Sequence, residues 1–136
     1  MAVSATSLAF REQNQFLRRK LNLPTNGWTD VYGREHDYAF TVAGANRDGL
    51  VADFRQAVER AIEGGGTLEE FRRDFDRIVA RHGWSYNGGR NWRSRVIYET
   101  NMRSSYMAGR YEQLMSVREE RPYWQYLHSD AVEYPR

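Results

Sequence analysis

The chain has 136 residues, a formal charge of +2, 40% hydrophobic residues and no cysteine. This length suits one domain, and the apolar content is too high for a disordered chain. The absence of cysteine excludes disulfides and thiolate metal sites. No run of about 18 apolar residues predicts a membrane span. The first residues carry neither a basic leader nor a continuous apolar stretch, so we expect no signal peptide and a soluble, intracellular protein.

The positive charge comes almost wholly from arginine and is unevenly distributed. Lys20 is the only lysine among twenty Lys and Arg residues. Residues 46–83 carry seven Arg against eight acidic residues, whereas residues 84–118 carry six Arg against two Glu. Because arginine pairs bidentately with carboxylates and phosphates, the segment 84–118 is a candidate contact surface. Codon usage in a GC-rich genome explains the arginine bias equally well without a functional role.

The N-terminal half of the chain predicts three helices separated by breakers. Residues 4–20 have a partial apolar face and end in basic residues, which suit a helix C-terminus. The Pro- and Gly-containing segment 22–27 predicts a break. A short helix is expected over 31–39. A stronger one is expected over 48–63, where apolar residues recur at helical spacing before a glycine triplet.

The next helix has the clearest start and stop signals in the chain. Thr67 followed by Glu70 is a capping box, and Gly83 supplies a C-terminal stop. Trp84 lies just beyond this stop, where we expect it to pack back onto the core. The apolar face of the helix consists of Leu68, Phe71, Phe75, Ile78 and Val79.

A long helix is predicted from Asn91, as N-cap, to about Glu119, before Pro122. Besides an apolar seam, it carries a row of small residues at a spacing of four: Thr100, Ser104 and Ala108. Small residues at this spacing let another backbone approach closely. The partner is either another helix of the same fold, which is the more common situation, or a helix of another protein.

The aromatic stretch 123–128 predicts a β-strand or extended segment, although no other convincing strand is present to pair with it. The fold class is therefore mainly α, with about five helices and one long helix near the C-terminus. We expect an N-terminal helix and linker over 1–27, a helical domain over 28–121, and an extended segment over 122–136 that begins a missing C-terminal portion.

The residues that could carry catalysis do not form a recognisable set. His36, His82 and His128 lie far apart, and no HExxH, GxSxG or P-loop spacing occurs. The paired carboxylates lie in a helix equally rich in arginine, as on a solvated, ion-paired face. We therefore expect a protein that is not an enzyme and uses no metal, cofactor or small-molecule substrate.

The strongest remaining chemical signal is cationic and aromatic. Arg90, Arg93 and Arg95 are interleaved with Trp84, Tyr86, Trp92 and Tyr98, and Arg103 and Arg110 follow on the same predicted helix. A surface of this kind holds phosphates and stacks bases. Nucleic-acid binding through 84–118 is therefore one hypothesis. In the alternative, the aromatics belong to the core and the arginines pair with acids.

Several stretches resemble the Mu F-like phage head morphogenesis (minor head) proteins: WTDVYGREHDYAFTVA (28–43), GTLEEF (66–71), HGW (82–84), YETNMRSSYMAGRYEQ (98–113) and RPYWQY (121–126). The resemblance implies a minor capsid protein of a phage or prophage head, located at the portal vertex or inside the capsid. It implies no catalytic residue and marks 99–110 as a signature helix. Family members continue beyond the RPYWQY block into a portion with histidines and often cysteines, so we expect this chain to be a fragment or a processed protein.

The resemblance implies docking to the portal protein or the major capsid protein, with packaged double-stranded DNA as a further contact and no membrane partner. Such a protein resides in the virion, and in the host cytoplasm during assembly. Two further hypotheses stay open: the chain is a nucleic-acid-binding protein, or it is the N-terminal delivery domain of a larger toxin or enzyme. The residues assigned to partner docking are Thr100, Ser104, Ala108, Trp124 and Tyr126.

Overall fold

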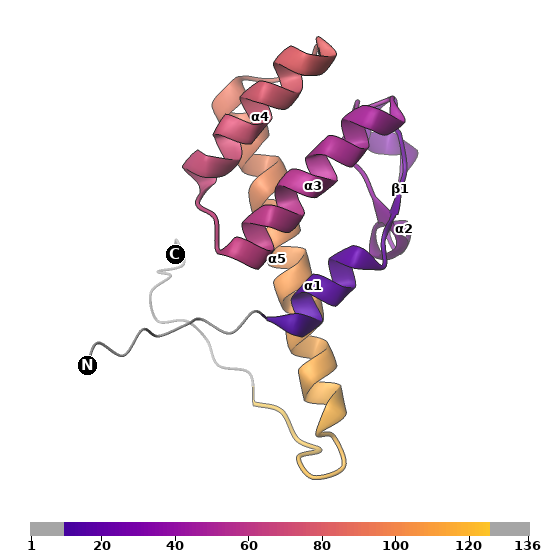
Figure 1. Cartoon of the computed structure of the whole chain (residues 1–136). Coiled ribbons are helices and arrows are strands. Elements are labelled where there is room, and N and C mark those ends of the chain that lie inside the picture. The colour runs from indigo at the N-terminus through magenta and orange to yellow at the C-terminus, as the bar shows by residue number, and fades with distance from the viewer. Residues whose placement is uncertain (1–9, 126–136) are drawn as a thin grey trace, which may run out of the picture.

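Four helices of two turns or more dominate the computed structural model, which describes residues 10–125 (Figure 1). The prediction of a mainly helical protein with its longest helix near the C-terminus is confirmed. In chain order the elements are α1 (Arg11–Arg18), β1 (Leu21–Asn22), the 3-10 turn η1 (Trp28–Asp30), α2 (Glu35–Tyr38), β2 (Ala39–Phe40), α3 (Asp48–Gly64), α4 (Leu68–His82) and α5 (Arg90–Ser116).

The hydrophobic core lies between α3, α4 and the first half of α5. Phe54 of α3 is fully buried, with its ring centroid 5.8 Å from that of Phe75 and 5.2 Å from that of Trp84. Trp84 packs back from beyond the end of α4, as its position predicts, and its indole N–H donates to the carbonyl of Gly44. The apolar spacing of the two helices therefore decides which faces meet.

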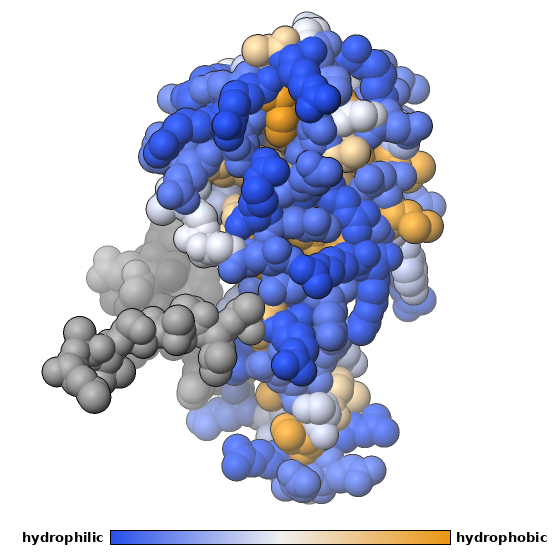
Figure 2. All heavy atoms as spheres, viewed as in Figure 1, coloured by the Kyte–Doolittle hydropathy of each residue, from blue (hydrophilic) through white to orange (hydrophobic). Residues whose placement is uncertain are grey.

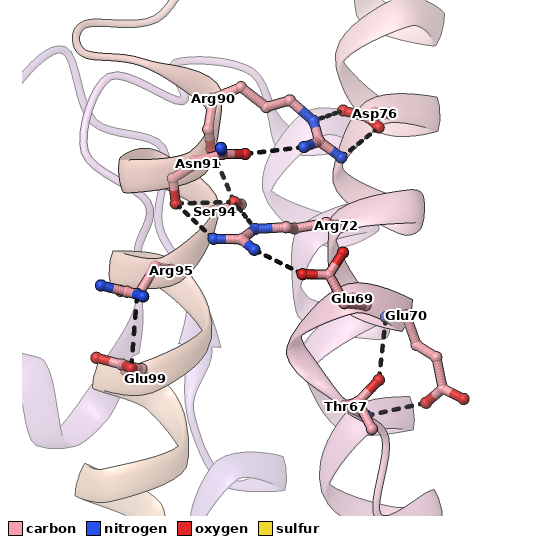
Figure 3. A network of polar contacts seen from close by, with 10 residues as sticks. All are labelled: Thr67, Glu69, Glu70, Arg72, Asp76, Arg90, Asn91, Ser94, Arg95 and Glu99. Atoms are coloured by element: carbon pink, nitrogen blue, oxygen red, sulfur yellow. Dashed lines mark hydrogen bonds and ion pairs between the residues drawn. The ribbon is translucent and has the colours of Figure 1, made fainter.

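The predicted capping signals around α4 are confirmed. The Thr67 hydroxyl accepts from the amide of Glu70, and the Glu70 carboxylate accepts from the amide of Thr67 (Figure 3). Gly83 ends the helix with a φ of 58°, in the left-handed region that glycine adopts without a steric penalty. Both ends of α4 are thus determined by local sequence.

Thr67→Ala should lower the free energy of unfolding by about 1 kcal/mol, because an N-terminal amide of α4 loses its acceptor. Urea unfolding followed by far-ultraviolet circular dichroism measures the change. Thr100→Ala is the matched control, since it replaces an exposed threonine inside α5 and alanine is the better helix former. Equal destabilisation by the two substitutions would contradict the capping role.

Helix α1 packs along the C-terminal half of α5 at a point of close backbone approach. A Cβ at Gly109 would lie 2.8 Å from the amide nitrogen of Gln13 and 2.9 Å from the ring of Phe10. One turn earlier on α5, the buried Ser105 hydroxyl accepts from the Gln13 amide group at 3.0 Å. The close contact within the fold is therefore made by Ser105 and Gly109, and not by the row at Thr100 that sequence singled out.

A single arginine links α3 to the end of α1. The Arg55 guanidinium donates to the carbonyls of Leu17, Arg18 and Lys20, and to the side chain of Asn22 at 3.0 Å. Leu17 and Arg18 belong to the last turn of α1, where carbonyls lack their usual intrahelical partners, and Lys20 lies just beyond the helix end. Arg55 thus caps α1 from a position more than thirty residues away, a role that no local sequence signal indicates.

Several predicted boundaries were wrong. Of the helix expected over 4–20, α1 forms Arg11–Arg18, Phe10 and Lys20 are not helical, and residues 4–9 lie outside the described part. The helix expected over 31–39 is reduced to α2, because Gly33 adopts a positive φ and the chain then extends into β2. β2 pairs in parallel with β1, a pairing that sequence did not reveal. Gly89, and not Asn91, is the N-cap of α5.

The aromatic strand predicted over 123–128 does not form in its described part. Residues 121–125 have no regular secondary structure, and residues 126–128 lie outside the described range. β1 and β2 pair with each other and not with this segment, and a single strand cannot form a sheet.

Candidate docking site

Arg90 is engaged by its own fold. Its guanidinium donates through two nitrogens to the Asp76 carboxylate of α4, at 2.7 and 2.8 Å (Figure 3). This bidentate hydrogen bond lowers the pKa of Asp76 and raises the pKa of Arg90. Beside it, Arg72 of α4 donates to the hydroxyl of Ser94 and the carbonyl of Asn91. Arg90 therefore joins the start of α5 to α4.

Arg93 is buried, which removes it from any surface that could contact phosphates. The residue is 8% exposed and donates to the carbonyl of Ala43, with its guanidinium 5.6 Å from the Trp84 ring centroid. Burial lowers its pKa. Within residues 10–125 its Nε has no hydrogen-bond partner.

The other three predicted arginines are exposed along α5. Arg95 and Arg103 lie 3.9 and 3.7 Å from the Glu99 carboxylate, and Arg110 donates to the side chain of Gln113. Exposed pairs of this kind contribute little to stability and are easily exchanged for another partner. The three guanidinium groups are therefore accessible to a binding partner.

The prediction that aromatic rings lie among the arginines on one exposed surface was wrong. Trp84 is buried, and Tyr98 packs against the core while its hydroxyl donates to the carbonyl of Gly66 at 2.8 Å. Tyr86 also packs against the core, and only Trp92 of the four is largely exposed. Three of the four rings therefore belong to the core or pack against it, as the alternative hypothesis stated.

The small-residue row lines a pocket between α5 and the segment 25–43. Thr100, Ser104 and Ala108 form part of one wall of this open cavity of about 640 Å³. Phe16, Trp28, Val31 and Met107 supply apolar surface, and Trp28 and Met107 are largely exposed. The row that sequence assigned to partner docking therefore faces an open groove.

Lys20 also lines this pocket, and it has no counter-ion there. The residue is 7% exposed, with its ammonium 4.8 Å from the Phe16 ring centroid. Within residues 10–125 no carboxylate lies within 4.0 Å of this ammonium, and it donates no hydrogen bond. Burial lowers the pKa of Lys20, Asp37 acts in the opposite sense, and Arg55 lowers the pKa further. In the sequence, Lys20 stands out only as the single lysine of the chain.

Lys20→Met should raise the free energy of unfolding by about 1 kcal/mol, because a largely buried cation without an ion pair or hydrogen bond in the described residues is replaced by an apolar chain of similar length. Urea unfolding of the two proteins measures the difference. Arg103→Met removes an exposed cation and should stay within about 0.5 kcal/mol of the parent. A loss of stability in Lys20→Met would show that the ammonium is compensated within the fold.

A second exposed feature, the distal aromatic cluster, lies at the C-terminal end of α5 and is formed by Tyr111 and Trp124. Trp124 packs edge-on against Tyr111 with centroids 6.1 Å apart. The last turns of α5 project beyond the body of the molecule (Figure 1). Figure 2 shows a mainly hydrophilic face with an apolar group near this projecting end. Tyr126, the other aromatic assigned to docking, lies outside the described residues.

The described histidines have local structural roles. His82 lies 2.7 Å from the Asp53 carboxylate and joins α4 to α3, and His36 lies 3.2 Å from the carbonyl of Val31. Over residues 10–125, no group of three or more His, Asp or Glu residues is arranged to hold a metal ion. In the same range, no helix has the length and apolar character needed to cross a membrane. His128 lies outside this range.

Two known proteins match most of the chain, and both come from Mu or a Mu-like prophage. One is named "Putative capsid assembly protein F" of Escherichia phage Mu and is 34% identical over 137 residues, covering 90% of this chain. The other is named "Mu-like prophage FluMu F protein" of Haemophilus influenzae and is 32% identical over 117 residues, covering 79% of this chain. The chain is therefore homologous to part of the Mu F-type proteins, which confirms the resemblance seen in its sequence.

The chain spans only a part of these relatives. It covers 31% of the length of the phage Mu protein and 28% of the Haemophilus protein. No family model matches the chain, and no solved structure matches it.

Proposed function

We propose that this chain acts in phage head assembly as a non-catalytic docking module. The observation that carries the proposal is its homology, over 90% of its length, to a protein named for capsid assembly. The chemistry of the described surface agrees, because the exposed features are an apolar pocket and an aromatic cluster rather than a set of reactive groups. Such a protein acts in the virion or at the site where heads are assembled.

The distal aromatic cluster is the proposed contact with the head, and the portal protein or the major capsid protein is the proposed partner. Tyr and Trp are enriched in protein interfaces because their rings bury a large area at a low entropic cost. The cluster lies on the projecting end of α5, where a partner can approach without displacing part of the fold. We propose that this docking takes place at the portal vertex or at the inner capsid surface.

Co-purification with the portal and major capsid proteins of the same phage tests the proposal, at low and at high salt. An apolar contact withstands high salt, because salt screens charges and does not weaken the burial of apolar surface. Retention of either head protein in both conditions is the expected result. Absence of both head proteins at both salt concentrations would refute the proposal.

The double variant Tyr111→Glu with Trp124→Glu should abolish this retention, since it places charge in the centre of the contact. Trp92→Glu is the matched control. Trp92 and Tyr111 are both 56% exposed and lie near opposite ends of the same helix. Loss of retention in the Trp92 variant alone would place the contact at the other end of α5.

Contact with packaged DNA is a second candidate function, supported by the exposed cations Arg95, Arg103 and Arg110. If they contact phosphates, affinity for double-stranded DNA should fall steeply with salt. Changing Arg103 and Arg110 to Gln should then reduce the slope of that dependence by about two. An unchanged slope would remove these residues from any DNA contact.

A further inference from the structure

We propose that the pocket beside Lys20 takes a single acidic side chain, flanked by apolar residues, from the head protein that docks here. This inference rests on the proposed function and names the chemistry of the partner segment. The ammonium of Lys20 is the counter-ion, and the apolar surface of Trp28, Val31 and Met107 receives the flanking residues.

The first observation is a buried cation whose hydrogen-bond donors are unused within the described residues. An ammonium has three donors, and within residues 10–125 that of Lys20 uses none of them. In the same range, Asn14 Oδ1 and Arg93 Nε are the fully enclosed side-chain atoms without a partner. Since Lys20 Nζ is also without a partner but is not enclosed, it keeps some accessible surface. The open space that Lys20 lines is the pocket.

The second observation is the chemistry of the walls. Lys20 is the one Lys or Arg among the described residues that line the pocket, and much of the remaining surface is apolar. A phosphate group is bound in proteins by several donors, commonly with arginine forks or backbone amides. One ammonium between apolar walls instead suits one carboxylate carried by an apolar segment.

Asp37 further limits which acidic segments the pocket can bind. It lines the pocket, is exposed, and does not form an ion pair with Lys20. Its carboxylate does not neutralise Lys20 by contact, and it repels each incoming carboxylate, so every acid beyond the one that pairs with Lys20 is disfavoured. The pocket therefore favours one acidic residue in an apolar context over an acidic run. Tyr111 lies one turn beyond Met107 on α5, so a single docked segment can reach both the pocket and the distal aromatic cluster.

The single lysine allows a direct test in the intact protein. With lysine labelled with carbon-13 at Cε, only Lys20 gives a side-chain signal. We expect 3-phenylpropionate to shift this signal saturably, with an apparent Kd about tenfold lower than that of the neutral 3-phenylpropionamide, the factor of a charge-assisted hydrogen bond. Inorganic phosphate should shift it no more strongly than the amide. Equal binding of acid and amide, or preferential binding of phosphate, would overturn the proposal.

Two variants separate a specific counter-ion from general electrostatics. The indole N–H signal of Trp28, which lines the same pocket, is the readout. Lys20→Met should reduce its response to 3-phenylpropionate to the level seen with the amide, whereas Arg103→Met should leave it unchanged. Equal losses in both variants would contradict the assigned role of Lys20.

Co-purification distinguishes this inference from the proposed function. If head proteins co-purify with the parent chain while the pocket shows no preference for the carboxylate, the inference fails and the proposed function stands. If head proteins co-purify and the pocket also prefers the carboxylate, Lys20→Met should weaken retention of the head protein about tenfold, as expected for a lost charge-assisted contact. If the pocket binds the carboxylate but no head protein is retained, the proposed function fails and the pocket remains a carboxylate site.

Discussion

Phe54→Ala is expected to lower the free energy of unfolding by about 4 kcal/mol, the largest effect of any single substitution considered. Phe54 is fully buried and contacts the rings of both Phe75 and Trp84, so its removal leaves a cavity between α3 and α4. A domain of this size has a total stability of only about 5–15 kcal/mol. Much of the population is therefore expected to unfold at modest urea concentrations.

Urea unfolding followed by tryptophan fluorescence measures this effect, since Trp84 is in direct contact with the deleted ring. Tyr38→Ala is the control, because Tyr38 is largely exposed and should change stability by no more than about 0.5 kcal/mol. A loss below about 2 kcal/mol in Phe54→Ala would mean that the core does not have the packing described.

Gly109→Ala should be the second most disruptive substitution, with an expected loss of about 2 kcal/mol. Alanine is the better helix former by about 1 kcal/mol, but its Cβ would lie 2.8 Å from the backbone nitrogen of Gln13. A backbone atom cannot rotate away as a flexible side chain can, so α1 must move and lose packing against α5.

The matched control is Gly64→Ala, another glycine within a helix, where an added Cβ meets nothing within 4 Å. It should be neutral or slightly stabilising. Hydrogen exchange at the amides of α1 localises the effect in Gly109→Ala, where protection of α1 should fall while that of α4 is retained. Unchanged protection of α1 would contradict the close approach of the two helices.

The two central helices could be read from the sequence because their signals are local. The capping box at Thr67, the stop at Gly83 and the apolar spacing of both helices act within a few residues. The same signals placed Trp84 against the core. By contrast, β1 and β2 contain two residues each, and their partners lie eighteen positions apart in the chain, as Leu21 pairs with Ala39. Neither segment has a pattern long enough to predict a strand.

The candidate site was only partly predictable. The spacing of Thr100, Ser104 and Ala108 correctly indicated a common face, and the structure shows that this face lines the pocket. Sequence could not show that Lys20 lines the same pocket, because the two segments lie eighty residues apart. For the same reason, sequence left open whether Arg90 and Arg93 are free cations or pair with acids. In the fold, Arg90 binds Asp76 and Arg93 is buried.

The sequence by itself determined the helical class, the ends of α4 and the resemblance to Mu F-type proteins, because periodicity, caps and matching stretches are properties of neighbouring residues. Only the tertiary structure decided which cations are paired or buried within the fold and which stay accessible to a partner. The free energy of a charge depends on its burial and on carboxylates within about 4–6 Å. Those distances are set by the approach of helices that are remote in the chain, and no local pattern encodes them.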